Sequence, residues 1–472
     1  MDKGILFANL TVWLLVLSNN SIQCVASASS DEINIIPTAD SPCPGASKGE
    51  PCCTLQQFAA NHTTFSANTT LKFYPGNHLL DSQLSISYVN SVAMWATKTA
   101  TVFCSQPYND YRFKFNEVHN VKISGIIFNG CSISILQSAG NIAIIKSSFL
   151  NKTGSECCSR GGVLSMNYMT ALGKGSSVLI KQCLFSDNIG GTGAIFDCSH
   201  SLTVDQCTFI NNYGSYSQGG AISKTDGYIS ILNSRFSHNR DIKEGGAIYI
   251  IAVGQATIAN CYFGDNIAGG TGGAVMALAT PVVVTNCYFT DNIANNSHGG
   301  ALWAYGSNGG VIITKSYFSD NVAGPSFGNG GAVYIEGAST PSGYHRDIHT
   351  TNQFPNVTIS GNTFEYNIAS GGGGAIYSGV RYSSISLTKN TFSHNTAANC
   401  GAVQVSEPYF HFSANFIGNT FTHNRATGQV GGKSGGGGMC ISKASALISD
   451  NTFSHNTAAG DAGALRGMRT VI

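Results

Sequence analysis

The hydrophobic and polar positions of this 472-residue chain follow one pattern that returns many times. In Ile229-Ser-Ile231 and Ser234-Arg-Phe236, apolar residues alternate with polar ones, shift phase once, and alternate again. Alternation with a period of two is typical of a half-buried strand, and the phase shift indicates a bend between two short strands. A loop then leads to Gly-Gly-Ala and an aliphatic residue, which begin a third strand. Each unit is therefore predicted to be a coil of about three short strands.

The coils repeat with a regular spacing. The motif Phe-x-x-Asn occurs in ten in-register copies between Phe185 and Asn456, usually 24 to 32 residues apart. A unit this short cannot bury its apolar face alone, so successive units must stack. The sequence thus predicts an all-β fold: a single right-handed parallel β-helix, with like positions about 4.8 Å apart in successive coils.

The recurrent residues take structural roles in this fold. The motif phenylalanines are expected to form an inward column, and the motif asparagines a ladder of side-chain amides at a turn. Glycine pairs such as Gly245-Gly246 allow positive φ where the chain enters the third strand. None of these three positions is expected to be catalytic.

Paired Phe-x-x-Asn and Gly-Gly-Ala-Ile/Val repeats cover about residues 145–472 and resemble those of the chlamydial polymorphic outer membrane proteins. The resemblance implies a β-helical, pectin-lyase-like passenger domain that acts as an adhesin. The sequence departs from that family after Leu465, where nothing resembles an outer-membrane barrel. Its sequons and cysteines fit an animal extracellular protein better than a bacterial autotransporter.

The chain is expected to have four parts. Residues 1–28 are predicted to be a signal peptide, because a short apolar run from Ile5 to Leu17 precedes a small-residue cleavage site. Residues 29–69 are predicted to be a cysteine-containing cap that covers the first coil, since bare strand edges invite aggregation. Residues 70–144 form irregular first coils, and residues 145–472 form the repeats.

The last repeat begins a new strand at Leu465, seven residues before the sequence stops. This pattern indicates an uncapped C-terminal end of the β-helix. Either a partner covers that end or the chain is a truncated product, and we favour truncation.

Composition narrows the choice of partners. Charged residues are 10 % of the chain and the net charge is +1, which argues against nucleic acid or an acidic membrane surface. No segment after the signal reaches the about 18 apolar residues of a membrane helix. Secretion through a eukaryotic pathway predicts N-glycosylation at five sequons, which are Asn61, Asn68, Asn151, Asn295 and Asn356.

Cysteine positions leave two interpretations open. An even number of cysteines remains after signal removal, which suggests disulfides in an exported chain. Four of them lie on the predicted inner face, two residues before the motif phenylalanine: Cys183, Cys207, Cys261 and Cys287. Neighbours in this row lie within the Cα range of a disulfide. Cross-coil disulfides and buried thiols that fill the core both fit this placement.

An outward row of tyrosines is the first candidate binding surface. Tyr262, Tyr288 and Tyr317 precede the motif phenylalanines of three consecutive coils. We expect a flat aromatic strip about 10 Å long, of the kind that packs on sugar rings or on a partner. Stabilisation of the sheet by stacked tyrosines is the alternative.

Titratable residues form another outward row, directly before the motif asparagines. Asp265, Asp291 and Asp320 offer weak calcium binding, while His394, His423 and His455 could bind a metal or titrate near pH 6. Solvated turn residues are the alternative for both sets. His345 and His349, in an insertion after Tyr334, are a further pair of candidate metal ligands. No other cofactor is expected.

The rival functional class is an enzyme, because pectin and pectate lyases and polygalacturonases share this fold. Such sites need grouped carboxylates, or a basic residue with bound calcium, and the sequence contains no such segment. We therefore expect a secreted or cell-surface protein that binds an extracellular glycan or protein without catalysis. Polysaccharide cleavage and a purely structural role are the alternatives.

Overall fold

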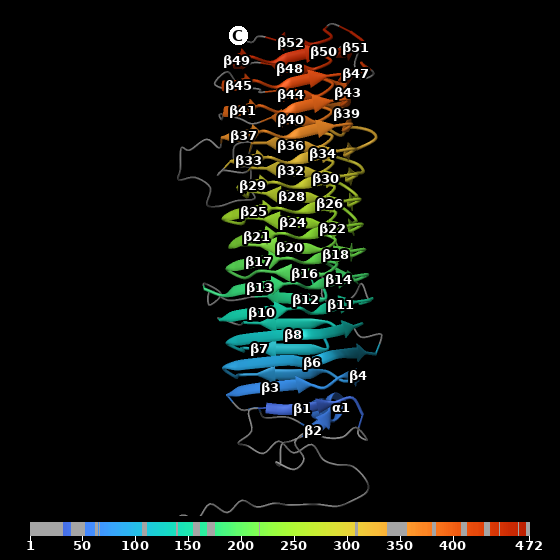
Figure 1. The fold of residues 1–472 in the computed structure, drawn as a ribbon, viewed down its shortest axis with the longest axis vertical. Coiled ribbons are helices and arrows are strands. Elements are labelled where there is room, and N and C mark those ends of the chain that lie inside the picture. The colour runs from blue at the N-terminus through green and yellow to red at the C-terminus, as the bar shows by residue number, and fades with distance from the viewer. Residues whose placement is uncertain are drawn as a thin grey trace, which may run out of the picture.

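The computed structural model is one elongated solenoid of about thirteen turns (Figure 1). The first and last described strands, β1 (Glu32–Ile36) and β52 (Leu465–Met468), lie at opposite ends of its long axis. The structure describes residues 32–38, 52–61, 65, 67–105, 111–137, 140–153, 161–167, 175–216, 218–306, 310–337, 356–379, 384–406, 413–428, 435–442, 444–460 and 462–468. The proposed signal peptide and the pair His345 and His349 lie outside these residues.

Three parallel sheets run along the solenoid, and each strand pairs with its counterpart in the next coil. The largest sheet takes two strands from most coils: β1 (Glu32–Ile36), β2 (Cys52–Thr54), β3 (Asn68–Phe73), β4 (Gly76–Leu80), β6 (Ser91–Cys104), β8 (Asn120–Asn129), β10 (Asn141–Ile145), β11 (Ser148–Leu150), β13 (Ser177–Lys181), β14 (Leu184–Ser186), β17 (Ser201–Asp205), β18 (Thr208–Ile210), β21 (Tyr228–Leu232), β22 (Arg235–Ser237), β25 (Gln255–Ala259), β26 (Tyr262–Gly264), β29 (Val282–Thr285), β30 (Tyr288–Thr290), β33 (Val311–Thr314), β34 (Tyr317–Ser319), β37 (Val357–Ser360), β38 (Thr363–Glu365), β41 (Ser384–Thr388), β42 (Thr391–Ser393), β45 (Ser413–Ile417), β46 (Thr420–Thr422), β49 (Ser445–Ser449) and β50 (Thr452–Ser454).

The two smaller sheets take at most one strand from a coil and have 14 and 10 strands. The 14-stranded sheet contains the strands that follow Gly-Gly-Ala or a close variant in the repeats, and the corresponding strands of the first coils: β5 (Leu84–Ser87), β7 (Phe113–Asn116), β9 (Ile133–Leu136), β12 (Leu164–Asn167), β16 (Ile195–Asp197), β20 (Ile222–Thr225), β24 (Ile248–Ile251), β28 (Val275–Leu278), β32 (Leu302–Tyr305), β36 (Val333–Glu336), β40 (Ile376–Gly379), β44 (Val403–Ser406), β48 (Met439–Ser442) and β52 (Leu465–Met468). The other contains mostly two-residue strands just after the motif asparagines: β15 (Ile189–Gly190), β19 (Tyr213–Gly214), β23 (Arg240–Asp241), β27 (Ile267–Ala268), β31 (Ile293–Ala294), β35 (Val322–Ala323), β39 (Ile368–Gly372), β43 (Thr396–Asn399), β47 (Arg425–Ala426) and β51 (Thr457–Ala458).

The predicted fold is confirmed, with one addition to the expected coil. In the coil of β25 to β28, the alternating segment gives β25 and β26, separated by a bend at Asn260, and Gly-Gly-Ala leads into β28. The sequence pattern did not separate β27 from the loop around it. Two residues are too few for alternation to be visible, so only pairing with the neighbouring coils defines this strand.

The motif phenylalanines form the expected inward column. From Phe128 to Phe453, successive rings stack with centroids 4.7–5.1 Å apart and with nearly parallel planes. Nearly all of these rings are fully buried, and they belong to one continuous apolar cluster along the solenoid. Burying each ring stabilises the fold by about 1.5–3 kcal/mol relative to leaving it exposed.

The motif asparagines form the expected ladder at the next turn. Each amide Nδ2 donates to the Oδ1 of the asparagine in the next coil at 2.9–3.1 Å, from Asn188 to Asn456. The same Nδ2 also donates to the carbonyl oxygen of the phenylalanine in the preceding coil, as Asn292 does to Phe263 at 3.0 Å. Most of these asparagines have no exposed surface, so the ladder satisfies polar groups that water cannot reach.

Each residue of the glycine pairs is required for a different reason. Gly245 has a φ of 63°, a conformation that side chains with a Cβ rarely adopt. Gly246 lies so close to the next coil that a Cβ would be 2.1 Å from the carbonyl oxygen of Gly273. The first glycine therefore makes the turn, and the second allows the coils to approach.

At the N-terminal end lies the helix α1 (Leu55–Asn61), which the sequence pattern did not predict. Leu55 and Phe58 of this helix are buried and join the apolar cluster. β1 pairs with both β2 and β3. The helix and the β1–β2 pairing lie within the segment for which a cap is expected, and the β1–β3 pairing joins that segment to the first coils.

One polar pair interrupts the apolar interior. Asp197 and Lys224 are register partners in β16 and β20, at positions where other coils carry residues such as Ile250 and Ile335. The Lys224 Nζ lies 2.9 Å from the Asp197 Oδ2, and neither side chain has exposed surface. Ser199 completes the site, since its Oγ donates to Asp197 and its carbonyl oxygen accepts from Lys224.

Candidate functional site

The tyrosine row lies on the outer face of the largest sheet, where Tyr262, Tyr288 and Tyr317 are direct register partners. The rings do not form the flat strip expected from the sequence. Tyr288 and Tyr317 are tilted by 48° at a centroid distance of 6.0 Å. Tyr288 is 54 % exposed, while its two neighbours are half-buried.

The tilt has a local cause, because each tyrosine has a different partner. The ring of Tyr262 lies under the guanidinium of Arg235, 4.2 Å from the ring centroid, and its hydroxyl bonds to Thr290. The Tyr317 hydroxyl donates to Glu365. These contacts rotate the outer rings away from a common plane, and they leave Tyr288 as the most accessible aromatic surface of the row.

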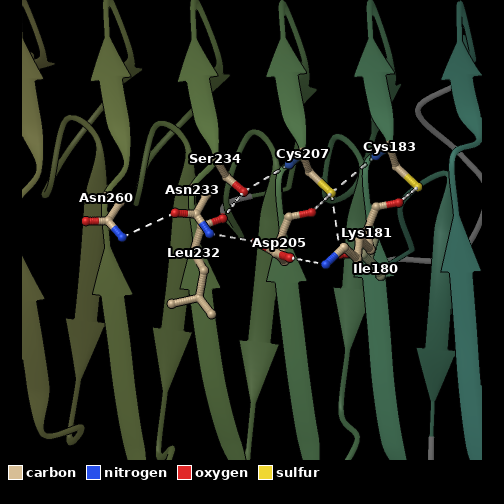
Figure 2. A network of polar contacts seen from close by, with 9 residues as sticks. All are labelled: Ile180, Lys181, Cys183, Asp205, Cys207, Leu232, Asn233, Ser234 and Asn260. Carbon is tan, nitrogen blue, oxygen red and sulfur yellow. Dashed lines mark hydrogen bonds and ion pairs between the residues drawn. The ribbon is translucent and has the colours of Figure 1, made fainter.

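A second asparagine ladder runs along the bend between the paired strands, on the outside of the solenoid (Figure 2). Asn286 donates to Asn260 at 2.8 Å, Asn260 to Asn233 at 3.2 Å, and Asn233 to Asp205 at 2.8 Å. Asp205 ends the chain of bonds in an ion pair with Lys181, at 2.7 Å. Hydrogen bonds from Lys181 and Asn233 lower the pKa of Asp205. The sequence analysis did not single out this outer ladder.

The outer ladder and the tyrosine row border one shallow hollow of about 390 Å³. Its lining includes the three ladder asparagines, with Arg235, Tyr262 and Tyr288 on the other side. The bend produces this shape, because Asn233 and Asn260 have φ near 50° and 55° and turn the chain between two strands. The hollow thus combines amides, one cation and an exposed aromatic ring over neighbouring coils. We call it the bend groove.

The aspartate row lies at the next turn, where Asp265, Asp291 and Asp320 all have positive φ. Partial burial and the charges of its two neighbours raise the pKa of Asp291. His238 approaches Asp265 at 3.8 Å. Among the residues that the structure describes, no group of three or more His, Cys, Asp or Glu side chains is placed to hold a metal ion. Weak calcium binding by this row stays a prediction.

The histidine row continues the same turn position towards the C-terminus. His394, His423 and His455 stack face to face at centroid distances of 5.0 and 4.7 Å, and Tyr366 extends the stack. Parallel stacked imidazoles direct their nitrogen lone pairs side by side rather than towards a common point. The row is thus a stacked surface feature, and it is not arranged as a metal site.

The four inner-face cysteines are buried thiols, so the structure contradicts the disulfide interpretation. Their row also contains Ser234 and Ser316, and each side chain accepts a backbone N–H from the preceding coil. The Sγ of Cys207 accepts the N–H of Cys183 at 3.4 Å, and Cys287 accepts that of Cys261 at the same distance. The contact with Cys183, together with burial, raises the pKa of Cys207, which stays a thiol.

Disulfides between neighbouring coils occur elsewhere. Cys104 bonds to Cys131, and Cys400 bonds to Cys440, with Cα atoms 5.1 and 5.5 Å apart. Cys53 is disulfide-bonded as well. No repeat motif marks these positions, so sequence alignment of the coils gave no signal for them.

A further aromatic row was missed by the sequence analysis. On the outer face of the sheet that contains β36, Trp303, Tyr334 and Tyr377 are register partners. Their rings are nearly parallel, with centroids 6.4 and 5.1 Å apart, and Tyr334 is only 5 % exposed. Burial raises the pKa of the Tyr334 hydroxyl, which donates to Glu336. This row packs against itself and leaves little ring surface for a ligand.

Four of the five sequon asparagines have described side chains. Asn68, Asn151 and Asn356 are exposed, and Asn295 is half-buried. The side chain of Asn61 lies outside the described part of the chain. Glycosylation of all five remains a prediction.

Comparisons with known proteins agree with the fold. Residues 100–281 match the model of the right-handed beta helix region, and residues 363–379 match the Chlamydia polymorphic membrane protein repeat. The chain thus contains a right-handed β-helix region and a segment that matches the polymorphic membrane protein repeat. No helix among the described residues is long and apolar enough to cross a membrane.

One curated relative is the metabotropic glutamate receptor-like protein R of Dictyostelium discoideum. It is 24 % identical over 238 residues, which cover 48 % of this chain and 14 % of that protein. The chain thus spans only a small part of the curated relative that it matches.

Similar solved structures include tailspike protein 3 of bacteriophage CBA120, with 10 % identity, a TM-score of 0.35, and coverage of 85 % of this chain and 56 % of that chain. The catalytic domain of a GH87 alpha-1,3-glucanase has 11 % identity, a TM-score of 0.33, and coverage of 96 % and 70 %. PfbA, a surface adhesin of Streptococcus pneumoniae, has 13 % identity, a TM-score of 0.33, and coverage of 82 % and 83 %. Likeness at this level does not extend to function.

Proposed function

We propose that this protein is an extracellular recognition module that binds a glycan or protein ligand along one flank of the solenoid without changing it covalently. The observation that carries the proposal is the bend groove. It presents Tyr288, the outer asparagine ladder and Arg235 at the outer surface over successive coils. Repetition at strand spacing suits an extended ligand, because each coil offers similar contacts about 4.8 Å further along.

The disulfide bonds support the extracellular location that this proposal includes. Two disulfides join neighbouring coils, and such bonds persist in oxidising compartments. Secretion, and glycosylation at the five sequons, are parts of the same proposal.

Catalysis is the competing function. The outer carboxylates beside the bend groove are either engaged, as Asp205 is with Lys181, or stand in a row at the turn beyond the tyrosines. Glycoside hydrolysis needs two carboxylates that face each other across a bond of the substrate. A single row along one edge does not provide that arrangement.

The proposal is tested with the purified full chain on an array of glycans and matrix proteins, in parallel with prolonged incubation with polysaccharides. We expect saturable binding and no increase in reducing ends or unsaturated products. Tyr288→Ala is expected to weaken binding. Sustained cleavage of a polysaccharide would establish the enzymatic alternative, and failure to bind any ligand would favour a purely structural role.

A further inference from the structure

We infer that the bend groove binds a linear acidic glycan, which lies parallel to the solenoid axis and directs a carboxylate or sulfate to Arg235. This inference rests on the proposed recognition function and names the ligand class. It follows from three properties of the groove. The ladder amides have unused hydrogen-bonding capacity, Arg235 forms no ion pair with a described residue, and the backbone N–H groups already bond to neighbouring coils.

The amides of the outer ladder keep part of their hydrogen-bonding capacity. An asparagine side chain has two N–H donors and an oxygen with two lone pairs. Asn260 uses one donor towards Asn233 and accepts one bond from Asn286, and no other side-chain bond to it is present among the described residues. The ladder therefore offers a donor and an acceptor in each coil, at side chains that are exposed. Sugar hydroxyl groups both donate and accept, so they match this set.

Arg235 supplies a cation at the edge of the ladder. Its guanidinium is held on the face of Tyr262, and it forms no ion pair with a described residue. In contrast, Lys181, another cation near the ladder, is neutralised by Asp205. Gly264 gives the Tyr262 ring room to lie flat, since a Cβ there would be 2.4 Å from the tyrosine hydroxyl. The guanidinium is thus held in place and has N–H groups available for an anion.

A second positive charge lies further along the bend. The coil after Asn286 carries the exposed Lys315 at the ladder position. The carboxylates of the aspartate row follow three residues after the tyrosines, on the side away from the bend. An acidic ligand is therefore expected to place its anionic groups on the bend side of the tyrosine row.

The backbone excludes a peptide that would bind as an additional strand. In the groove, the N–H groups of Asn260 and Asn286 donate to Thr285 and Thr314 of the next coils, and that of Tyr288 donates to Cys261. A peptide that binds by strand addition needs an open edge with free backbone groups. Only side chains are available here, and their donor–acceptor set fits hydroxyl groups better than a peptide backbone.

The exposed ring of Tyr288 completes the site. A tyrosine face packs against the C–H groups of a sugar ring, and the ring of Tyr317 lies beside that of Tyr288 at a centroid distance of 6.0 Å. Successive sugars would meet Arg235, the Asn260 amide and Tyr288 in turn. Affinity should therefore increase with chain length until the ligand spans the coils from Asn233 to Lys315.

The test compares matched pairs of linear polysaccharides: a polyuronate with its neutral methyl ester, and a sulfated galactan with its desulfated form. Binding to the full chain is measured by calorimetry or by surface immobilisation. The double variant Asn260→Gly/Asn286→Gly removes two ladder amides but keeps the backbone, because glycine occupies the same bend position at Gly361 and Gly418, with φ of 65° and 63°. Asn211→Gly is the matched control. Asn211 is also exposed, has positive φ and bonds to a neighbouring carboxylate, Asp187, but it lies at a different turn.

We expect the wild-type chain to prefer the acidic member of each pair. The double variant should weaken binding by about tenfold or more, consistent with the loss of several hydrogen bonds. Arg235→Gln should abolish the preference for acidic over neutral ligands, and Asn211→Gly should change affinity by less than about twofold. Circular dichroism and thermal unfolding establish that each variant is folded.

Two results would overturn the inference and leave the proposed function intact. One is equal binding of acidic and neutral glycans. The other is binding of a glycan or matrix protein that the ladder and Arg235 variants do not change. Absence of binding to every glycan and matrix protein tested would instead overturn the proposed recognition function itself.

Discussion

Several asparagine ladders run along this solenoid, and comparing the inner ladder from Asn188 to Asn456 with the outer ladder separates structural from functional chemistry. Both use the same side chain and the same bond from Nδ2 to Oδ1 between neighbouring coils. Asn266 and Asn292 of the inner ladder are fully buried and also bond to the backbone. The side chains of Asn260 and Asn286 in the outer ladder are exposed and, among the described residues, bond only to each other and to Asn233.

The difference teaches that burial, and not residue type, decides what a polar ladder contributes. A buried amide that loses its partner leaves several polar groups without hydrogen bonds. The fold is destabilised, because water cannot reach these groups to replace the lost bonds. An exposed amide that loses its partner bonds to water instead. The inner ladder therefore holds the fold together, whereas the outer ladder has capacity left for a ligand.

The largest expected effect is at the other buried polar site. Lys224→Met should lower the free energy of unfolding by about 3–5 kcal/mol, because it leaves the Asp197 carboxylate buried without its cation. The double variant Lys224→Met/Asp197→Leu should recover most of this loss in urea unfolding. A loss below about 1 kcal/mol in the single variant would show that water reaches the pair.

Asn292→Ala should lower the free energy of unfolding by about 3 kcal/mol. The substitution removes the acceptor of two N–H groups of Asn266, the donor to Phe263 and the donor to Asn321. Chemical denaturation of the variant and of Asn260→Gly, measured together, tests the contrast directly. Equal losses in the two variants would contradict the distinction between the ladders.

The buried carboxyl group of Asp241 makes the stability of the fold depend on pH. Burial raises its pKa from 3.8 to about 6, even though the backbone N–H groups of Gln218, Lys243 and Glu244 bond to the carboxylate. The folded state therefore binds the proton more tightly than the unfolded state does, and stability falls as pH rises from about 4 to 6. The contribution is about 3 kcal/mol at most.

Thermal unfolding of the wild-type chain and of Asp241→Asn, recorded between pH 4 and 7, isolates this effect. The difference in stability between the two proteins should change across that range in favour of the variant. A difference that is independent of pH would mean that Asp241 ionises normally in the folded state.

The inner-face cysteine row predicts a smaller effect. Cys207→Ser should change the free energy of unfolding by less than about 1 kcal/mol, since Ser234 performs the same role one coil later. Cys207→Val fills similar space but cannot accept the N–H of Cys183, and it should cost about 1–2 kcal/mol. If valine were tolerated as well as serine, the row would be filling space only.

The smallest effect on stability is expected in the outer ladder. Asn260→Gly should lower the free energy of unfolding by less than about 0.5 kcal/mol, because its two amide bonds are exposed and glycine accepts positive φ. Its thermal midpoint should lie within experimental error of that of Asn211→Gly. A large loss would show that the outer ladder is structural as well.

The repeat pattern determined the fold, and it also determined which residues form each row of equivalent positions along the solenoid. Alternation and its one phase shift placed Phe263 inside and Tyr262 outside, and the spacing of the motifs determined which residues lie side by side. The amide ladder of Asn266 and Asn292 could be predicted for the same reason. In a solenoid, residues that are one repeat apart in the sequence lie next to each other in space, because each coil pairs with the next.

The tertiary structure decided what the residues of each row do. A residue's row is determined by its place in the repeat, but its rotamer depends on partners in neighbouring coils. Arg235 therefore turns the ring of Tyr262, and Glu365 holds Tyr317, so that the expected flat strip does not form. The side chains of the cysteine row accept hydrogen bonds, because the backbone N–H groups beside the bend need partners. The outer ladder and its groove arise only when the bends of successive coils are stacked, since their side-chain bonds join residues 26 to 28 positions apart in the chain.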